Sequence, residues 1–133
     1  MLREHDLEIR VRYQETDAQG VVHHANYLTW FESGRVELLR ACGHSYRALE
    51  DDGLMLVVAE ANLKYFLPAR FDDLIRLTTR TLSTRGARIR HEYRLVRGDE
   101  LLMTGTTSVA CIDRNGRVRR LPDWLLLPGE ASE

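Results

Sequence analysis

The stretch ETDAQGVVHHANY, residues 15–27, contains residue types that could carry out chemistry. Asp17 supplies a carboxylate, Gly20 allows a tight turn, and the adjacent His23 and His24 precede a segment with helical periodicity. A helix start has unpaired backbone N–H groups and the positive end of the helix dipole, so it stabilises developing negative charge. A carboxylate facing such an end provides a base or nucleophile together with an oxyanion site, which is the chemistry of acyl transfer.

The same residues also have purely structural interpretations. An aspartate ahead of a glycine turn commonly accepts hydrogen bonds from nearby backbone N–H groups, and a histidine at a helix start often only packs its ring. No HExxH or CxxC pattern accompanies His23 and His24, and we expect their side chains to point in different directions. No metal site is therefore predicted.

Hydrophobic periodicity predicts the elements that position these residues. Residues 7–13 alternate apolar and charged side chains, as a half-buried strand does, and residues 25–42 follow a helical period that Gly43 could terminate. Ser45 could cap a short second helix that ends at EDDG, residues 50–53. The predicted apolar arc of the long helix, expected to be core, is Tyr27, Trp30, Phe31, Gly34, Leu38, Ala41 and Cys42.

The rest of the chain is predicted to form strands separated by turn residues. The predicted strands are residues 54–66, 74–82, 88–96 and 101–112. Short turns favour antiparallel neighbours, so we expect a four-strand meander whose apolar face is covered by the only long apolar helix. The predicted fold class is α+β, an antiparallel β-sheet wrapped around a long central α-helix.

Length and composition indicate one ordinary domain. The 133 residues carry 19 basic and 20 acidic side chains, which gives no reason to expect nucleic acid as a partner. No apolar run suggests a signal peptide or an integral membrane segment, and two cysteines, Cys42 and Cys111, are too few for a disulfide framework. We expect residues 1–133 to be a single cytoplasmic domain whose polar tail, PGEASE at 128–133, frays.

The first motif, extended by Glu32 and Arg35, resembles the signature of hotdog-fold acyl-CoA thioesterases of the 4-hydroxybenzoyl-CoA thioesterase and YbgC-like type. PARFDD, GTTSVACID and RVRRLPDWL resemble later segments of that family in order and spacing. The residues that carry the first motif are Tyr13, Thr16, Asp17, Gly20, Val22, His24, Asn26 and Tyr27.

The resemblance implies a thioesterase domain that hydrolyses an acyl-CoA to a carboxylic acid and CoA. Asp17 would be the catalytic general base or nucleophile, and the backbone N–H near His24 would polarise the carbonyl, with the His24 side chain as a further candidate. No cofactor is implied, because coenzyme A is part of the substrate. A non-catalytic acyl-thioester or lipid-binding module and a hotdog dehydratase are the alternatives. The candidate substrate-binding residues are Gly20, Val22, His23, Asn26, Tyr27, Glu32, Arg88 and Arg90.

Some of these candidates also follow from charge placement. Glu32 and Arg35 are three residues apart on the predicted helix and are expected to pair. Arg88, Arg90 and Arg94 share one face of a predicted strand, where they could bind the phosphates of coenzyme A or simply be solvated.

Open sheet edges invite pairing with another chain, so a homodimer is the expected minimum unit. The resemblance implies active sites at the dimer interface and further assembly into a homotetramer.

Overall fold

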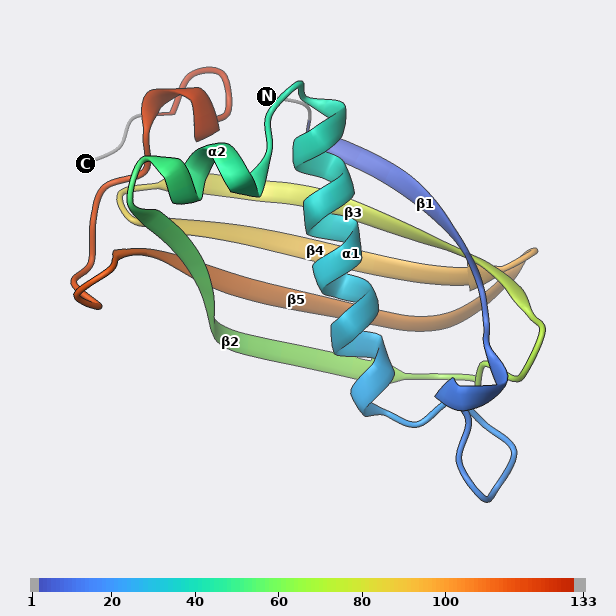
Figure 1. Cartoon of the computed structure of the whole chain (residues 1–133). Coiled ribbons are helices and arrows are strands. Elements are labelled where there is room, and N and C mark those ends of the chain that lie inside the picture. Colours follow the sequence, from blue (N-terminus) through green and yellow to red (C-terminus); the bar gives the residue numbers. More distant parts are fainter. Residues whose placement is uncertain (1–2, 131–133) are drawn as a thin grey trace.

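The computed structural model describes residues 3–130, which form one sheet, two α-helices and two short 3-10 helices (Figure 1). The elements in chain order are β1 (Glu4–Arg10), η1 (Tyr13–Glu15), α1 (Ala25–Ala41), α2 (Tyr46–Asp51), β2 (Leu54–Tyr65), β3 (Leu74–Arg85), β4 (Arg88–Arg97), β5 (Glu100–Asp113) and η2 (Asp123–Leu125).

The five strands form one antiparallel sheet in the order β1-β3-β4-β5-β2 (Figure 1). Strands β3, β4 and β5 form a meander as predicted. The prediction is wrong for β2, which pairs with β5 rather than with β3. The segment 66–73 therefore passes the ends of β5 and β4 instead of making a tight turn.

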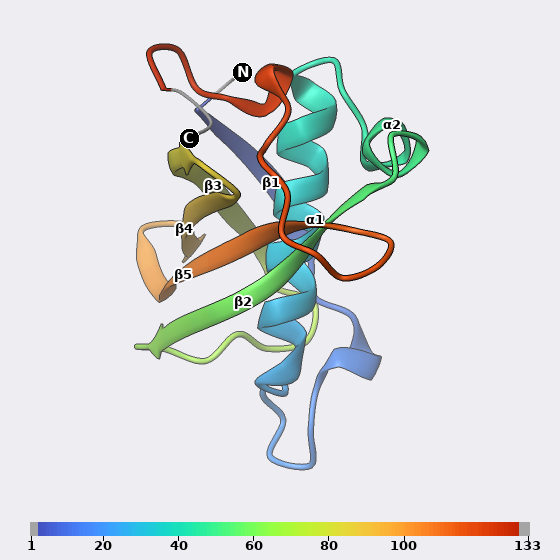
Figure 2. The same cartoon turned by 90° about the vertical axis from the view of Figure 1, so that its left-hand side faces the viewer.

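Helix α1 lies along one face of the sheet, as Figure 2 shows from the side. The predicted core residues Trp30, Phe31 and Leu38 are buried, and the Phe31 ring stacks on Tyr93 of β4 with 3.8 Å between ring centroids. Gly34 faces β3 so closely that an added Cβ would lie 2.2 Å from the hydroxyl oxygen of Thr79. The predicted sheet wrapped around a long helix is therefore confirmed.

The C-terminal end of α1 differs from the predicted arc. Ala41 is exposed and Cys42 is only partly buried, whereas Leu39 and Arg35 are buried. The buried side of the helix differs at this end because α2 and the C-terminal segment pack against it, in a cluster that contains Leu39, Leu49 and Leu121. Gly43 ends the helix as predicted, with φ of +85°.

Helix α2 begins as predicted, because the Ser45 hydroxyl accepts a hydrogen bond from the Ala48 N–H. The segment after β5 packs back on the sheet through a second buried cluster that includes Leu121 and Leu125. The predicted tail differs from expectation at Glu130, whose carboxylate accepts hydrogen bonds from the backbone N–H and the hydroxyl of Thr84. Residues 131–133 of that predicted tail lie outside the described residues.

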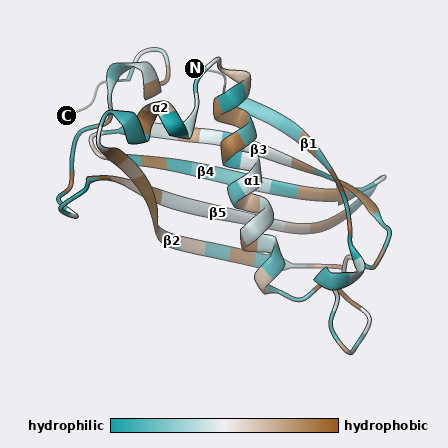
Figure 3. Ribbon diagram, viewed as in Figure 1, coloured by the Kyte–Doolittle hydropathy of each residue, from teal (hydrophilic) through white to brown (hydrophobic). Residues whose placement is uncertain are grey.

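Strand boundaries shift most at the N-terminus, where β1 ends at Arg10 rather than at residue 13. Tyr13, the last residue of the predicted strand, belongs to η1 and is 75% exposed. Strand β2 forms one edge of the sheet and exposes most of its side chains, although Figure 3 shows its first half as apolar. Within residues 3–130, no helix is both long and apolar enough to cross a bilayer.

Candidate functional site

Asp17 lies in a tight turn closed by the hydrogen bond from the Gly20 N–H to the Asp17 carbonyl. The segment between η1 and α1 extends as a loop beyond the start of α1 (Figure 1). The Asp17 Oδ1 accepts hydrogen bonds from the backbone N–H groups of Gln19 (2.8 Å) and Val21 (3.4 Å). Gly20 makes the turn possible with φ of +82°, a conformation that side chains disfavour. The Asx turn expected from the structural interpretation is thus present.

The base of this turn is tied to the helix start. Thr16 and Val22 form a bridge across the turn, and the His23 N–H donates to the Glu15 carbonyl at 2.8 Å. The Asn26 side-chain amide donates to the same carbonyl, also at 2.8 Å. These bonds fix the base of the turn that carries Asp17 to the residues at the N-terminus of α1.

Glu15 is a buried residue of the motif, and no role was predicted for it from the sequence. Its carboxylate accepts hydrogen bonds from the Arg12 N–H at 2.7 Å and from the Trp30 indole N–H at 2.9 Å, and it pairs with the Arg12 guanidinium at 3.4 Å. These bonds join η1 to α1 and satisfy a charge that is only 4% exposed. The signal in the sequence was a glutamate three residues after Arg12, the capping-box spacing.

The two histidines lie at the exposed start of α1. Their rings stack with 4.3 Å between centroids, so the prediction that they point in different directions is wrong. The His23 Nδ1 accepts a hydrogen bond from the Ala25 N–H at 3.2 Å. Among residues 3–130, no acceptor is found for the His24 N–H, which makes it a candidate donor to a ligand.

An apolar groove of about 290 Å³ lies beside this helix start. It is lined by Val21, Val22, His24, Tyr27, Tyr65, Phe66, Leu67 and Pro68. Burial raises the pKa of Tyr27, so its hydroxyl stays protonated as a hydrogen-bonding group. The groove thus combines a helix-end N–H with an apolar wall, and the turn of Asp17 adjoins it through Val21 and Val22.

The segment 66–73 forms one wall of the groove and is anchored from behind. The Arg97 guanidinium donates to the Asp73 carboxylate at 2.7 Å and to the Pro68 carbonyl at 3.1 Å. On the other side, the Val22 N–H donates to the Ala69 carbonyl at 2.9 Å, and Val21 forms a bridge with Arg70. The turn that carries Asp17 is therefore connected to the end of β4 through this segment.

Glu32 and Arg35 do not form the predicted ion pair. Glu32 is exposed, whereas Arg35 is buried and donates to the Tyr93 hydroxyl at 3.0 Å. The three-residue spacing allows an ion pair between Glu32 and Arg35, but the Arg35 guanidinium binds the buried Tyr93 hydroxyl of β4 instead. Glu32 thus lies on the open surface of α1.

Arg88 and Arg90 lie on the sheet face opposite α1. Strand β4 alternates as predicted, with Ile89 and His91 buried between the exposed arginines. Arg88 donates to the Ser108 hydroxyl at 3.1 Å. Neither arginine lies on the face that carries the Asp17 turn within one chain.

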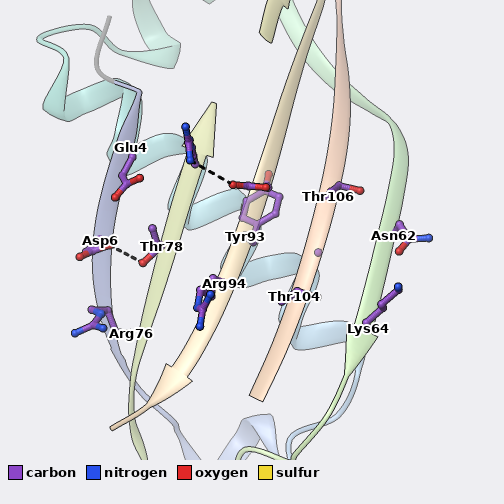
Figure 4. A pocket seen from close by; sticks show the side chains of 13 residues that line it. Glu4, Asp6, Asn62, Lys64, Arg76, Thr78, Tyr93, Arg94, Thr104 and Thr106 are labelled. Atoms are coloured by element: carbon purple, nitrogen blue, oxygen red, sulfur yellow. Dashed lines mark hydrogen bonds and ion pairs between the residues drawn. The ribbon is translucent and has the colours of Figure 1, made fainter. Parts of the chain in front are cut away.

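The same outward face has a shallow polar hollow of about 760 Å³, which Figure 4 shows from close by. It has acidic side chains on β1, Glu4 and Asp6, and basic ones further across, including Arg94 and Lys64. Asp6 accepts a hydrogen bond from the Thr78 hydroxyl at 2.6 Å (Figure 4). The hollow is thus charged at both margins.

The structure places seven of the ten candidate residues in the turn that precedes α1 and in the first turn of that helix. These are Asp17, Gly20, Val22, His23, His24, Asn26 and Tyr27. Glu32 lies further along the helix, and Arg88 and Arg90 lie on the other sheet face. No group of three or more potential metal ligands occurs in residues 3–130.

Comparisons with known proteins show the family to which the chain belongs. The family model described as the Thioesterase-like superfamily matches residues 11–128. The acyl-CoA thioesterase YbgC of Haemophilus influenzae is 41% identical over 106 residues, covering 79% of this chain and 78% of that protein. The acyl-CoA thioester hydrolase YbgC of Escherichia coli O157:H7 is 36% identical over 106 residues, covering 79% of both chains.

A solved structure of similar fold is the DHNA-CoA thioesterase from Staphylococcus aureus, with a TM-score of 0.84 and 30% identity over 87% of this chain and 80% of that one. An antiparallel sheet wrapped around one helix is the hotdog fold, which this chain shares with that thioesterase. The chain belongs to the Thioesterase-like superfamily. The predicted family resemblance and enzyme class are thereby confirmed.

Proposed function

We propose that this protein hydrolyses an acyl-CoA thioester to a carboxylic acid and free CoA. The observation that carries the proposal is the turn of Asp17, joined by backbone bonds to a helix start whose His24 N–H has no acceptor within residues 3–130. The names of the YbgC relatives support the choice of acyl-CoA as the substrate class.

In the proposed reaction, Asp17 accepts a proton from water as the water oxygen attacks the thioester carbon. The carbonyl oxygen becomes an oxyanion, which the His24 N–H and the positive end of α1 stabilise. Collapse of this intermediate breaks the carbon–sulfur bond, and the CoA thiolate takes up a proton. Alternatively, Asp17 attacks the carbon itself, and water then hydrolyses the resulting anhydride.

Neither route needs a metal or a separate cofactor, because coenzyme A arrives with the substrate. The apolar groove would hold the part of the substrate that adjoins the thioester carbonyl. Val22 and Tyr27 would form walls of the groove, and Gly20, His23 and Asn26 would shape the entrance to the groove. Glu32 is a further candidate contact from α1. Arg88 and Arg90 are exposed cations that could pair with the CoA phosphates.

We further propose that the working unit is a homodimer formed through β2. This edge strand exposes apolar side chains, namely Met55, Val57 and Val58. An unpaired apolar edge is stabilised when it pairs with a second copy of itself. Helix α2 lies by the start of β2 and the N-terminus of α1 by its end (Figure 1), so antiparallel pairing would bring the Asp17 turn of one chain beside α2 of the other.

A homotetramer is the proposed full assembly. The outward sheet face is acidic on β1 and carries most of its basic side chains on β3 and β4, so two such faces related by a twofold axis can place unlike charges opposite each other. Sedimentation equilibrium is expected to give the mass of two chains at high salt and four at low salt. A monomer at micromolar concentration under both conditions would contradict this assembly.

We place the protein in the cytoplasm, consistent with the buried thiol of Cys111.

The direct test is thiol release from benzoyl, phenylacetyl, short, medium and long acyl-CoAs, followed with a thiol-reactive dye. Hydrolysis of at least one class is expected. Binding of these compounds without thiol release would instead indicate a non-catalytic acyl-thioester module. Dehydration of a hydroxyacyl-CoA without thiol release would indicate a dehydratase.

Two substitutions at position 24 separate the backbone from the side chain. His24→Pro removes the N–H, and the φ of −57° at this position suits proline. We expect kcat to fall by about 10²–10³-fold, the effect of losing one oxyanion donor. His24→Ala keeps the N–H and is expected to retain kcat within about threefold. Equal activity of the two variants in the thiol-release assay would contradict the backbone role.

A further inference from the structure

Glu15 is bonded to both sides of the candidate site, through its side chain and through its main chain. The main-chain carbonyl accepts from the His23 N–H and from the Asn26 side-chain amide, each at 2.8 Å. The carboxylate accepts from the Arg12 N–H with one oxygen and from the Trp30 indole N–H with the other. One residue therefore links η1, the end of the loop before α1 and the second turn of that helix.

The two groups that carry the proposed chemistry lie next to these bonds in the chain. Asp17 follows Glu15 by two residues, and the proposed oxyanion donor, the His24 N–H, belongs to the residue after His23. His24 is exposed and Asp17 is half-buried, whereas Glu15 is only 4% exposed. The separation between the carboxylate of Asp17 and the His24 N–H thus depends on a buried link at Glu15.

Trp30 provides a fixed anchor for this link. Its ring is 4% exposed and contacts the Tyr27 ring edge-on, with 5.2 Å between the ring centroids. Side chains in such a close-packed core have little room to turn. Residues 18–20, by contrast, are exposed. Loss of the bond between Glu15 and Trp30 is therefore relieved by a shift of the Asp17 turn and not of the indole.

Only a carboxylate satisfies both donors at position 15. One of its oxygens lies 2.7 Å from the Arg12 nitrogen, and the other lies 2.9 Å from the Trp30 indole nitrogen. A glutamine of the same shape offers one acceptor oxygen and one NH₂ donor group. Either orientation of that amide sets two donors against each other, and an unpaired buried donor is costly.

We propose that Glu15 is a positioning residue that sets the distance between Asp17 and the His24 N–H. It does so through the bonds of its carboxylate to Arg12 and Trp30. The inference rests on the proposed function, which gives Asp17 and the His24 N–H their roles. Glu15 does not line the apolar groove, so it acts through the backbone and not on the substrate.

The first test is Glu15→Gln, assayed by thiol release at a temperature well below the melting temperature of every variant. We expect kcat per folded molecule to fall by about 10–10²-fold, because a shift of about 1 Å misplaces reacting groups by that much. The matched control is Glu130→Gln. The Glu130 carboxylate also accepts two hydrogen bonds, but from the backbone N–H and the hydroxyl of Thr84 on β3. This variant should retain wild-type kcat.

A spectroscopic readout does not depend on turnover. The backbone amides of Gln19, Val21 and His24 report on the Asp17 turn and on the proposed donor in two-dimensional ¹H–¹⁵N NMR spectra. Glu15→Gln is expected to shift these three signals, and Glu130→Gln should leave them in place. Unchanged signals in a folded Glu15→Gln protein would overturn the positioning role.

A second substitution tests the cause of the effect. Trp30→Phe removes the indole N–H and keeps an aromatic ring, so it is expected to lower kcat by only about three- to tenfold. In the double variant, the amide at position 15 no longer opposes the indole donor. Its kcat should therefore return to the level of Trp30→Phe alone. If Glu15→Gln does not fold, wild-type kcat in Trp30→Phe would overturn the proposal.

The positioning role and the proposed function fail in different ways. No thiol release from any acyl-CoA, or full activity of Asp17→Asn, contradicts the proposed function. An active wild type and an inactive Asp17→Asn, together with a folded Glu15→Gln that is as fast as the wild type, overturn the positioning role alone.

Discussion

Replacing Asp17 with asparagine is expected to lower kcat for thioester hydrolysis by about 10²–10⁴-fold, the contribution of a general acid–base group. Asparagine keeps the side-chain oxygen that accepts from the Gln19 and Val21 N–H groups, so the turn should persist. What it removes is the negative charge and the basicity. Thiol release and the melting temperature, measured on the same preparations, check both halves of this expectation.

The chain contains a closely matched control for this substitution. Asp113 occupies the first position of a second turn of the same kind, in which its Oδ1 accepts from the N–H groups of Asn115 (2.9 Å) and Arg117 (3.0 Å). That turn is not attached to the start of α1. Asp113→Asn is therefore expected to retain wild-type kcat. Full activity of a folded Asp17→Asn variant would remove Asp17 from the mechanism.

Gly34→Ala is expected to destabilise the fold by about 1–3 kcal/mol, the usual cost of overpacking a core. In an exposed helix the same change would stabilise by roughly 1 kcal/mol, so the sign of the effect reports on packing. The added Cβ would lie 2.2 Å from the Thr79 hydroxyl oxygen and 3.0 Å from the Leu77 side chain. Urea unfolding measures the difference.

The cause can be isolated with a double-mutant cycle. Thr79→Ala removes the oxygen that the new methyl group would meet, so it should recover much of the loss in the Gly34→Ala background. Ser33→Ala is the control on the exposed side of α1 and should change stability by only a few tenths of a kcal/mol. A more stable Gly34→Ala protein would mean that α1 lies further from β3.

Local patterns predicted the elements well because each leaves a periodic signal. Strand β4 was found from its strict alternation, and α1 from its helical period ending at Gly43. The order of strands was not predictable in the same way. Turn residues in 66–73 indicate that the chain changes direction, but they do not indicate how far it travels before it pairs again.

The candidate site was predictable to the extent that it is local in sequence. Asp17, Gly20 and His24 lie within eight residues, so one motif contains them all. The partner of Arg35 is Tyr93, which is 58 residues away. A helix spacing rule could only offer Glu32, since it has no information about side chains on a different element.

The bonds that hold the segment 66–73 limit how the length of this loop could vary among members of the family. Surface loops usually tolerate insertions and deletions. Here Ala69 is bonded to Val22 on one side, while Arg97 holds Pro68 and Asp73 on the other. One added or deleted residue would shift these partners out of register and move the turn that carries Asp17. A loop that is distant from the motif in sequence is thus one whose length the position of the Asp17 turn constrains.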